Sequence, residues 1–318
     1  MGKKILRALL FLAGFALLFA CFNHLMAPKN TTEEAGMHEA HAKGFLAEPA
    51  HSLDALILGN SEAYRGVTPL RIWEAYGITA YSCGTNDQIL YQTEDYLSRA
   101  LENQSPGVVF LETDTIFRDH NTLDVVPHQM EELFPLIRYH DRWKNLHISD
   151  FTQPIRFDAV SQGKGYTYLD HSDPVDAAGY MAPSDEVAPI PKKNIRHVQN
   201  ILDLCQTHGA QLVLFSTPST MNWNYARHNA VVQLAQQLGV EYIDMNLMPE
   251  EIPIDWRTDT MDQGNHMNYY GAKKVSEYLG KYLSETNLFT DKRSLPEFAP
   301  WNDALADFYE TNHIEPNS

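Results

Sequence analysis

The sequence has 318 residues, of which 24 are Lys or Arg and 41 are Asp or Glu, giving a net charge of −17 at neutral pH. A nucleic-acid-binding protein is disfavoured, because phosphate contacts need clustered basic side chains that this sequence does not assemble. Hydrophobic residues make up 44% of the chain, which excludes global disorder and allows one large core or two small ones. Three scattered cysteines exclude a disulfide framework or a zinc ribbon and leave open a single bridge between Cys83 and Cys205.

Residues 1–29 predict a membrane anchor or signal segment. The stretch from Ile5 to Met26 is almost wholly apolar and long enough for one membrane-spanning helix. Basic residues at its start place the N-terminus in the cytoplasm and the remaining chain outside. Two alternatives to an uncleaved anchor are a cleaved signal peptide and a lipoprotein signal ending at Cys21. In all three cases the following domain lies on the extracytoplasmic side of the cell membrane.

Short apolar runs alternate with amphipathic segments between residues 51 and 286, after a polar segment, 30–50, that we interpret as a stalk. The predicted strands are 53–58, 79–82, 108–111, 211–216 and 241–244, and the predicted helices are 70–76, 89–103, 194–208, 230–238 and 269–283. Strands that alternate with helices of this length predict a mostly parallel sheet in a three-layer α/β/α sandwich.

Two segments depart from this alternation. Residues 117–193 are rich in His, Asp, Pro and Tyr, and we expect an insertion over the strand ends rather than a separate domain. Within it, Arg142 is a candidate contact for an anionic substrate and Trp143 a candidate stacking platform, whereas a buried ion pair that fixes the insertion is the alternative. Residues 287–318 contain several prolines and predict a surface tail.

Ligands of an open parallel sheet bind beyond the carboxyl ends of its strands, and three loops with suitable chemistry follow predicted strands or precede a helix. In the first, Gly59 lets the chain turn after a buried strand and presents Ser61; a plain turn or helix cap is the alternative. In the second, Gly84, Asn86 and Gln88 are candidate oxyanion donors, with helix capping as the competing interpretation.

The third loop precedes the last predicted helix of the sheet and contains Asp259, Asp262 and His266. An imidazole with a nearby acid is what a general base and its orienting carboxylate require, although a lone histidine there is more often a surface residue. A serine, a histidine and an aspartate that share one edge of a sheet make nucleophilic catalysis the leading hypothesis.

These residues, with the surrounding sequence, resemble the SGNH (GDSL-like) hydrolase superfamily, in particular its membrane-anchored bacterial branch related to the D-alanyl-lipoteichoic acid biosynthesis protein and the alginate O-acetylation proteins. The resemblance spans roughly residues 53–283 and rests on Gly59-Asn60-Ser61, Thr68-Pro69, Trp73-Glu74, Tyr76-Gly77, Gly84, and Asp262 with His266-Met267-Asn268 and Gly271-Ala272-Lys273-Lys274.

The resemblance implies Ser61 as nucleophile, His266 as base and Asp262 as its partner, with the N–H groups of Ser61 and Gly84 in the oxyanion hole. Two departures stand out. The family's Asp lies three residues before the His, where this sequence has Gln263, so Asp259 is a fallback for Asp262. The family's oxyanion Asn is absent from loop 111–114, and Asn86 or Gln88 is a candidate replacement.

The resemblance further implies an extracytoplasmic serine acyltransferase or esterase that acts on acetyl or D-alanyl esters of a cell-envelope polymer. A membrane-bound O-acyltransferase is the implied partner, and no cofactor is needed. A plain esterase or deacetylase with water as acceptor has the same triad. The alternative from another class is a non-catalytic scaffold or binding subunit, which the two departures favour.

Histidines outside the third loop suggest no metal site. The pair His38 and His41 is one residue short of the spacing that places two imidazoles on one helical face. Thr217 and Ser219 follow the fourth predicted strand, where they either line the pocket or simply end the strand.

Overall fold

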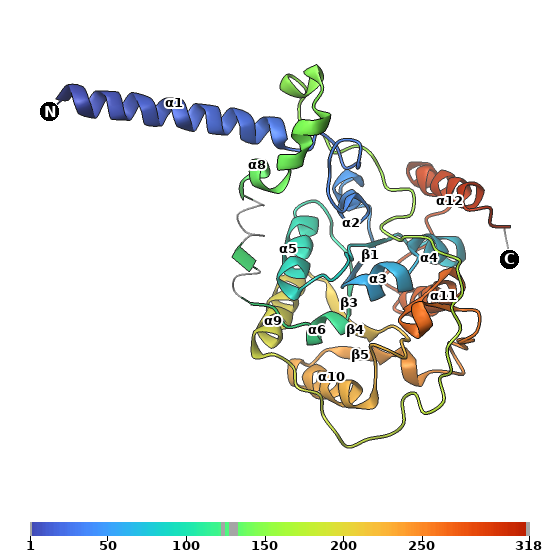
Figure 1. Ribbon diagram of the computed structural model, residues 1–318. Coiled ribbons are helices and arrows are strands. Elements are labelled where there is room, and N and C mark those ends of the chain that lie inside the picture. Colours follow the sequence, from blue (N-terminus) through green and yellow to red (C-terminus); the bar gives the residue numbers. More distant parts are fainter. Residues whose placement is uncertain (1, 122–124, 127–132, 316–318) are drawn as a thin grey trace. The chain divides into compact units, whose positions relative to one another are not determined.

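The computed structural model describes residues 2–121, 125–126 and 133–315 (Figure 1). The chain divides into two compact units, one formed by residues 1–40 and 120–159 and the other by residues 41–119 and 160–318. The predicted insertion, 117–193, is therefore wrong in its extent, because only residues 117–119 and 160–193 belong to the unit that contains the sheet. Its middle part, 120–159, packs with the N-terminal segment instead.

The first unit contains one long apolar helix and several short helical turns. Helix α1 covers Gly2–Met26, and α8, η2 and η3 cover Pro135–Arg138, His140–Asn145 and Ile148–Phe151. Helix α1 is long and apolar enough to cross a membrane, with a mean hydropathy of 2.4 over its best window.

The second unit is built on a five-stranded, all-parallel sheet with the strand order β2-β1-β3-β4-β5. The strands are β1 (Ala55–Leu58), β2 (Ala80–Ser82), β3 (Val108–Glu112), β4 (Gln211–Ser216) and β5 (Glu241–Asp244). After β2 the chain returns to the other side of β1, so the order reverses between β1 and β3. This reversal opens a crevice at the carboxyl ends of these two strands.

Helices cover both faces of the sheet, as predicted for a three-layer α/β/α sandwich (Figure 1). They are α3 (Ser61–Gly66), α4 (Pro69–Tyr76), α5 (Leu90–Leu101), α6 (Asp114–Phe117), α9 (Lys192–Thr207), α10 (Tyr225–Leu238) and α11 (Tyr269–Glu285). In β1, Leu56 and Leu58 pack with residues of α5 and α9, whereas Ala55 and Ile57 pack with residues of α3 and α11. Successive strand residues point to opposite faces, which explains why the strands are apolar throughout.

The predicted stalk ends earlier than expected. Residues from His41 onward belong to the sheet-containing unit, where α2 (Ala40–Lys43) and η1 (Gly44–Ala47) bury Ala42 and Phe45 in the core. The hydroxyl of Tyr81, in β2, donates a hydrogen bond of 2.6 Å to the His41 carbonyl. A segment that contributes core side chains is part of the domain and not a linker to it.

The prediction of a C-terminal surface tail is also wrong. Residues 296–311 form η6 (Pro296–Phe298) and α12 (Ala299–Thr311), and α12 buries Trp301 and Phe308 in the core. Cys83 and Cys205 are both buried and free, so the possible bridge between them is not formed.

Candidate active site

The loop after β1 holds Ser61 at the start of a helix. Gly59 has a φ of +145°, and Asn60 caps α3 by accepting a hydrogen bond of 3.0 Å from the Glu62 N–H. A Cβ atom on Gly59 would lie 2.7 Å from Cβ of Glu112, so glycine allows the turn to approach β3 this closely. Ser61 is thereby presented as the first residue of α3, at the crevice between β1 and β3.

Ser61 is hydrogen-bonded to a histidine 205 positions later in the chain. Its Oγ lies 2.9 Å from Nε2 of His266, and Nδ1 of the same ring lies 3.0 Å from Oδ2 of Asp262. The three predicted residues therefore meet. If Nδ1 carries the proton and donates it to Asp262, Nε2 is the nitrogen that accepts the proton of the Ser61 hydroxyl.

The pKa of His266 is lowered from its usual 6.5. Burial is the largest cause, because it disfavours the charged imidazolium, and the positive charge of Arg65 acts in the same direction. The hydrogen bond to Asp262 and its negative charge act in the opposite direction. The ring is therefore neutral at pH 7, which is the state that a general base needs.

Asp262 reaches His266 because of an unusual turn. The short strands β6 (Thr260–Met261) and β7 (His266–Met267) pair antiparallel, and η5 (Asp262–Gly264) connects them. Asp262, Gln263 and Gly264 have φ values of +51°, +56° and +83°, a left-handed run that accommodates the four-residue offset from Asp to His. Left-handed backbone at two non-glycine residues costs free energy, of order 1 kcal/mol or more each.

Asp259, the alternative partner for His266, contacts other residues. Oδ2 of Asp259 accepts hydrogen bonds from Lys274 Nζ at 2.6 Å and from the Asp255 N–H at 2.8 Å. Oδ1 accepts one from the Thr258 hydroxyl at 2.9 Å. Asp259 thus fixes the start of the loop, and Asp262 is the carboxylate that contacts His266.

Two backbone N–H groups near Ser61 are available as donors. Gly84 packs so closely against the start of α3 that an added Cβ would lie 2.7 Å from Asn60 O and 3.1 Å from Tyr64 N. Among the residues that the structure describes, neither the N–H of Ser61 nor that of Gly84 has a hydrogen-bond acceptor. Both are free to donate to an oxyanion formed next to Ser61.

The two side chains predicted as further oxyanion donors, Asn86 and Gln88, make different contacts. Gln88 is fully buried, and its amide nitrogen donates to Cys83 O at 3.1 Å and to Thr85 Oγ1 at 3.2 Å, so both its N–H groups are used. The prediction that Gln88 is an oxyanion donor is therefore wrong. Its side chain instead stabilises the loop after β2. Asn86 is exposed and donates to the carboxylate of Asp87 at 3.2 Å, so its role stays a prediction.

Arg142 does not belong to the unit that contains Ser61. Its buried guanidinium pairs with Asp150 at 3.0 Å and donates to the carbonyls of Leu25 and Ala27. The prediction of a substrate contact is wrong, and the alternative of a buried ion pair that fixes the insertion is confirmed.

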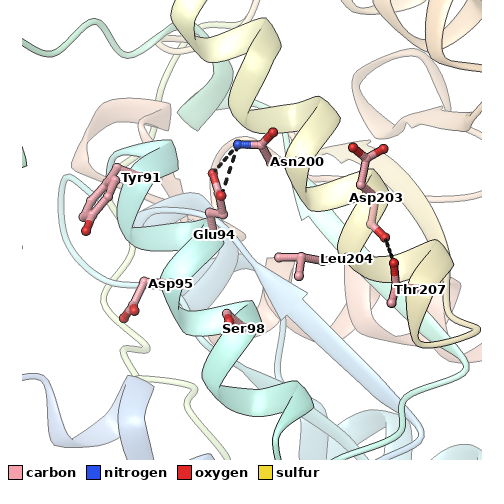
Figure 2. Close-up of a pocket in the computed structure, with 8 residues that line it drawn as sticks. All are labelled: Tyr91, Glu94, Asp95, Ser98, Asn200, Asp203, Leu204 and Thr207. Atoms are coloured by element: carbon pink, nitrogen blue, oxygen red, sulfur yellow. Dashed lines mark hydrogen bonds between the residues drawn. The ribbon is translucent and has the colours of Figure 1, made fainter.

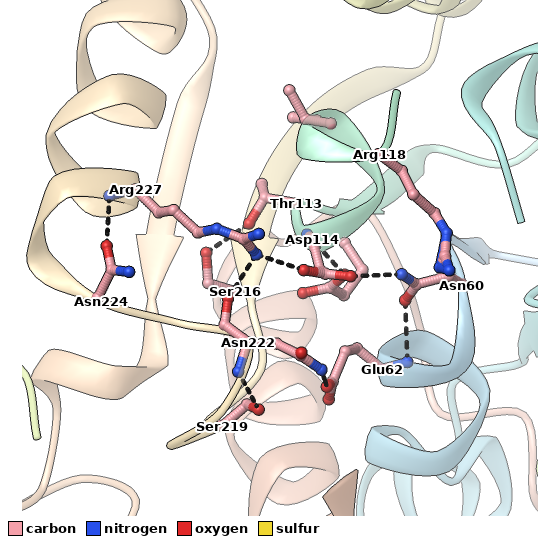
Figure 3. Close-up of polar contacts among 12 residues, drawn as sticks. Asn60, Glu62, Thr113, Asp114, Arg118, Ser216, Ser219, Asn222, Asn224 and Arg227 are labelled. Atoms are coloured by element: carbon pink, nitrogen blue, oxygen red, sulfur yellow. Dashed lines mark hydrogen bonds and ion pairs between the residues drawn. The ribbon is translucent and has the colours of Figure 1, made fainter. Parts of the chain in front are cut away.

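A polar network, partly buried, surrounds the residues next to Ser61 in the chain and was not predicted from the sequence (Figure 3). Asn60 Nδ2 donates to Asp114 at 2.6 Å, and Arg227 donates to the other oxygen of Asp114 at 2.5 Å. Arg227 also donates to the carbonyl of Asn222. These contacts connect the residue before the nucleophile to loops after β3 and β4.

Asn222 links the segment of Ser61 to the segment of His266. Its Nδ2 donates to Glu62 Oε1 at 2.6 Å and to Asn265 Oδ1 at 2.7 Å, and these two residues are the sequence neighbours of Ser61 and His266. Ser219, which the sequence suggested as a pocket residue or strand end, donates to the Asn265 carbonyl at 2.8 Å. The amide of Asn222 and the hydroxyl of Ser219 therefore hold the loops of Ser61 and His266 together.

The network contains two fully buried carboxyl groups, Glu62 and Glu112. Burial raises both pKa values well above the usual range, and the charge of Asp114 raises both further. Sequence reasoning missed them because acidic residues are normally exposed. Their positions in the sequence could have indicated burial, since Glu62 directly follows Ser61 and Glu112 ends a buried strand.

Arg65 lies one helical turn after Ser61, on the same face of α3. Its guanidinium contacts Sδ of Met261 at 3.7 Å, and Met261 is the residue that pairs with His266 across the β6–β7 hairpin. Within the described part of the chain, no carboxylate forms an ion pair with Arg65. This uncompensated charge is the reason for its effect on His266.

A separate cavity of about 460 Å³ lies between α5 and α9 (Figure 2). Acidic side chains, among them Glu94, Asp95 and Asp203, line it, and none of the residues around Ser61 does. The described residues include no group of three or more His, Cys, Asp or Glu side chains that could hold a metal ion. His38 lies 3.5 Å from Asp141, and the ring of His41 packs on that of Tyr64.

No protein-family model matches the chain, and no curated protein does. Among solved structures, a GDSL-like lipase from Bacteroides thetaiotaomicron aligns with 11% identity and a TM-score of 0.35 over 73% of this chain and 88% of the lipase. The acetyl xylan esterase Est2A from Butyrivibrio proteoclasticus aligns with 10% identity and a TM-score of 0.31 over 75% of this chain and 65% of the esterase.

Proposed function

We propose that the chain is a serine esterase or acyltransferase of the SGNH type, which forms an acyl-enzyme at Ser61. The observation that carries this proposal is the hydrogen-bonded series Ser61, His266 and Asp262, with distances of 2.9 and 3.0 Å. A nucleophile, a base in reach of its hydroxyl and a carboxylate on the other ring nitrogen are the parts that acyl transfer requires.

In the first half-reaction, Ser61 Oγ attacks the carbonyl carbon of the substrate ester, and its proton passes to Nε2 of His266. The negative charge that forms on the carbonyl oxygen faces the N–H groups of Ser61 and Gly84. When the tetrahedral intermediate collapses, the alcohol leaves with the proton from His266 and the acyl group stays on Ser61. Asp262 stabilises the transient imidazolium and keeps its ring oriented.

In the second half-reaction, His266 removes a proton from an acceptor hydroxyl, which attacks the acyl-enzyme and regenerates Ser61. Water as the acceptor gives a hydrolase, whereas a sugar or polymer hydroxyl gives a transferase. Helix α1 supports an acceptor at the membrane, because the helix would tether the domain there. We therefore infer an O-acyl (acetyl or D-alanyl) ester of an extracytoplasmic cell-envelope polymer as substrate, with a membrane-bound O-acyltransferase as partner.

The geometry supports an enzyme over a scaffold. A scaffold subunit has no need of a neutral imidazole held between a serine hydroxyl and a carboxylate. The left-handed turn at Asp262 also costs stability, and its evident effect is to bring a carboxylate to the ring.

Labelling with a fluorophosphonate tests the proposal on the full chain in detergent, compared with Ser61→Ala and His266→Ala. Wild type should label, and both variants should lose the label because they lack the nucleophile or its base. With an acetyl ester as substrate, release of acetate by water alone would indicate an esterase, whereas mass spectrometry of an added oligosaccharide acceptor would detect transfer. Unlabelled wild type beside a labelled control esterase would favour the scaffold.

A further inference from the structure

The segment that begins at Leu133 is attached to the end of α1 that lies far from the N-terminus. The ring of Phe134 packs against that of Phe19 with centroids 5.5 Å apart, and the Leu136 N–H donates to Asn23 Oδ1 at 2.9 Å. Both partners lie in the last third of α1. The segment therefore follows the helix at a depth that belongs to the predicted membrane span.

Arg142 completes this attachment. Its guanidinium donates to the carbonyls of Leu25 at 2.9 Å and Ala27 at 2.7 Å, which the helix leaves without internal partners at its end. A positive charge at this position is also favourable for the helix dipole. The ion pair with Asp150 holds the arginine in place and ties η3 to the same point.

The same segment exposes large apolar side chains. They have exposed fractions of 69% (Leu133), 43% (Ile137), 64% (Trp143), 91% (Ile148) and 66% (Phe151). Five such residues within 19 positions are unusual for a water-facing surface, because burying apolar area is worth about 25 cal/mol per Å². Among the residues that the structure describes, none in this unit covers these five side chains, so the segment needs another cover.

We propose that residues 133–151 form a collar in the outer leaflet of the membrane, where these side chains contact lipid. The occupant follows from continuity, since the collar packs on α1, which exposes large apolar side chains between Ile5 and Phe22. Phe19 lies seven residues before the end of α1, about 10 Å below it, which is the boundary between acyl chains and headgroups. Tryptophan favours that boundary.

The collar rests on one part of the proposed function, the membrane insertion of α1, and is independent of the chemistry at Ser61. It changes how the protein is held. One helix alone can rotate and tilt freely, whereas a collar that inserts beside it would fix the unit to the membrane at a second place.

Quenching of tryptophan fluorescence by brominated lipids tests the collar on the full chain in lipid nanodiscs. Trp73, Trp223 and Trp301 are buried, and Trp256 is partly buried in the sheet-containing unit, so bromine on the acyl chains should quench mainly Trp143. Replacing Trp143→Phe should remove most of the quenching, and discs of unbrominated lipid correct for the lost emission.

Two results would overturn the inference. Equal quenching of the wild type and the Trp143→Phe variant, in chains that co-purify with the discs, would mean that Trp143 faces water or awaits a protein partner. A chain that fails to enter the discs would remove the anchor and the collar together, while leaving labelling of Ser61 unaffected. As a second reporter, a fluorophore on Ile148→Cys in a Cys21→Ser background should shift to the blue in discs.

Discussion

The two sides of Ser61 use carboxyl groups in opposite ways. On one side, Asp262 is half-exposed on a left-handed turn and contacts the imidazole of His266. On the other side, Glu62 and Glu112 are fully buried, and their pKa values are raised well above the usual range. The exposed carboxylate is placed to stabilise a charge that appears during the reaction. The buried carboxyl groups favour their neutral form and hold the loops together.

The largest effect on the exposed side is expected from Asp262→Asn. Loss of the charge should lower kcat about a hundredfold, because His266 loses its orienting partner and the imidazolium loses stabilisation. Steady-state ester hydrolysis measures this. Asp259→Asn is the matched control, which should lower thermal stability through its lost Lys274 contact without a comparable loss of kcat. A larger loss of kcat in Asp259→Asn than in Asp262→Asn would assign the orienting role to Asp259.

On the buried side, Asn222→Ala should lower both stability and activity. Glu62 and Asn265 would lose their shared donor, at a cost of about 1 to 3 kcal/mol in the free energy of unfolding. Because these residues adjoin Ser61 and His266, kcat should fall about tenfold. Asn224→Ala removes only the cap of α10, so it should cost about 1 kcal/mol and leave kcat unchanged. Equal kcat values for the two variants would refute a positioning role for Asn222.

The raised pKa of Glu62 predicts a stability that depends on pH. The folded state binds a proton that the unfolded state releases above pH 4.5, so stability falls as pH rises from there toward the folded pKa. The slope is about 1.4 kcal/mol per pH unit for one proton. Glu62→Gln should remove this contribution, and the stability it gains over wild type in urea melts should grow from pH 5 to pH 8. Exposed Glu310→Gln should show no such trend.

The smallest effect is expected from Arg65→Gln. Removing the positive charge should raise the pKa of His266. Since the neutral ring is the active base, the acidic limb of the kcat/KM profile should move to higher pH. Arg65→Lys keeps the charge and should keep the profile. An unchanged profile in Arg65→Gln would show that the charge of Arg65 does not influence the pKa of His266.

The parallel sheet could be predicted because its strands are continuous apolar runs between amphipathic helices. Strands β4 and β5 have the predicted bounds, and the others differ by only one or two residues at either end. Helix α12 was missed because Pro296 and Pro300 suggested irregular chain, whereas proline is well tolerated in the first turn of a helix. Its buried residues Trp301 and Phe308 lie seven positions apart, and Ala304 and Leu305 between them also pack against the core.

The residue types of the candidate site could be predicted from the sequence, but the contacts that hold these residues in place could not. Ser61 and His266 follow from their places beside a strand end and before a helix. The selection of Asp262 over Asp259 depends on three left-handed residues, which no periodicity reveals. The partners of Asn222 come from segments 43 and 160 positions away in the chain, and only the fold brings them together.

One ion pair ties the beginning, middle and end of the sheet-containing unit together. Glu48 and Lys164 meet at 2.8 Å, both almost fully buried, and Lys164 Nζ lies 4.4 Å from the centre of the Trp301 ring. The contact between Lys164 and Trp301 forms only when α12 packs onto the unit, so the cover over this ion pair depends on that helix. Removal of α12 should consequently uncover a lysine and a carboxylate that are otherwise almost fully buried.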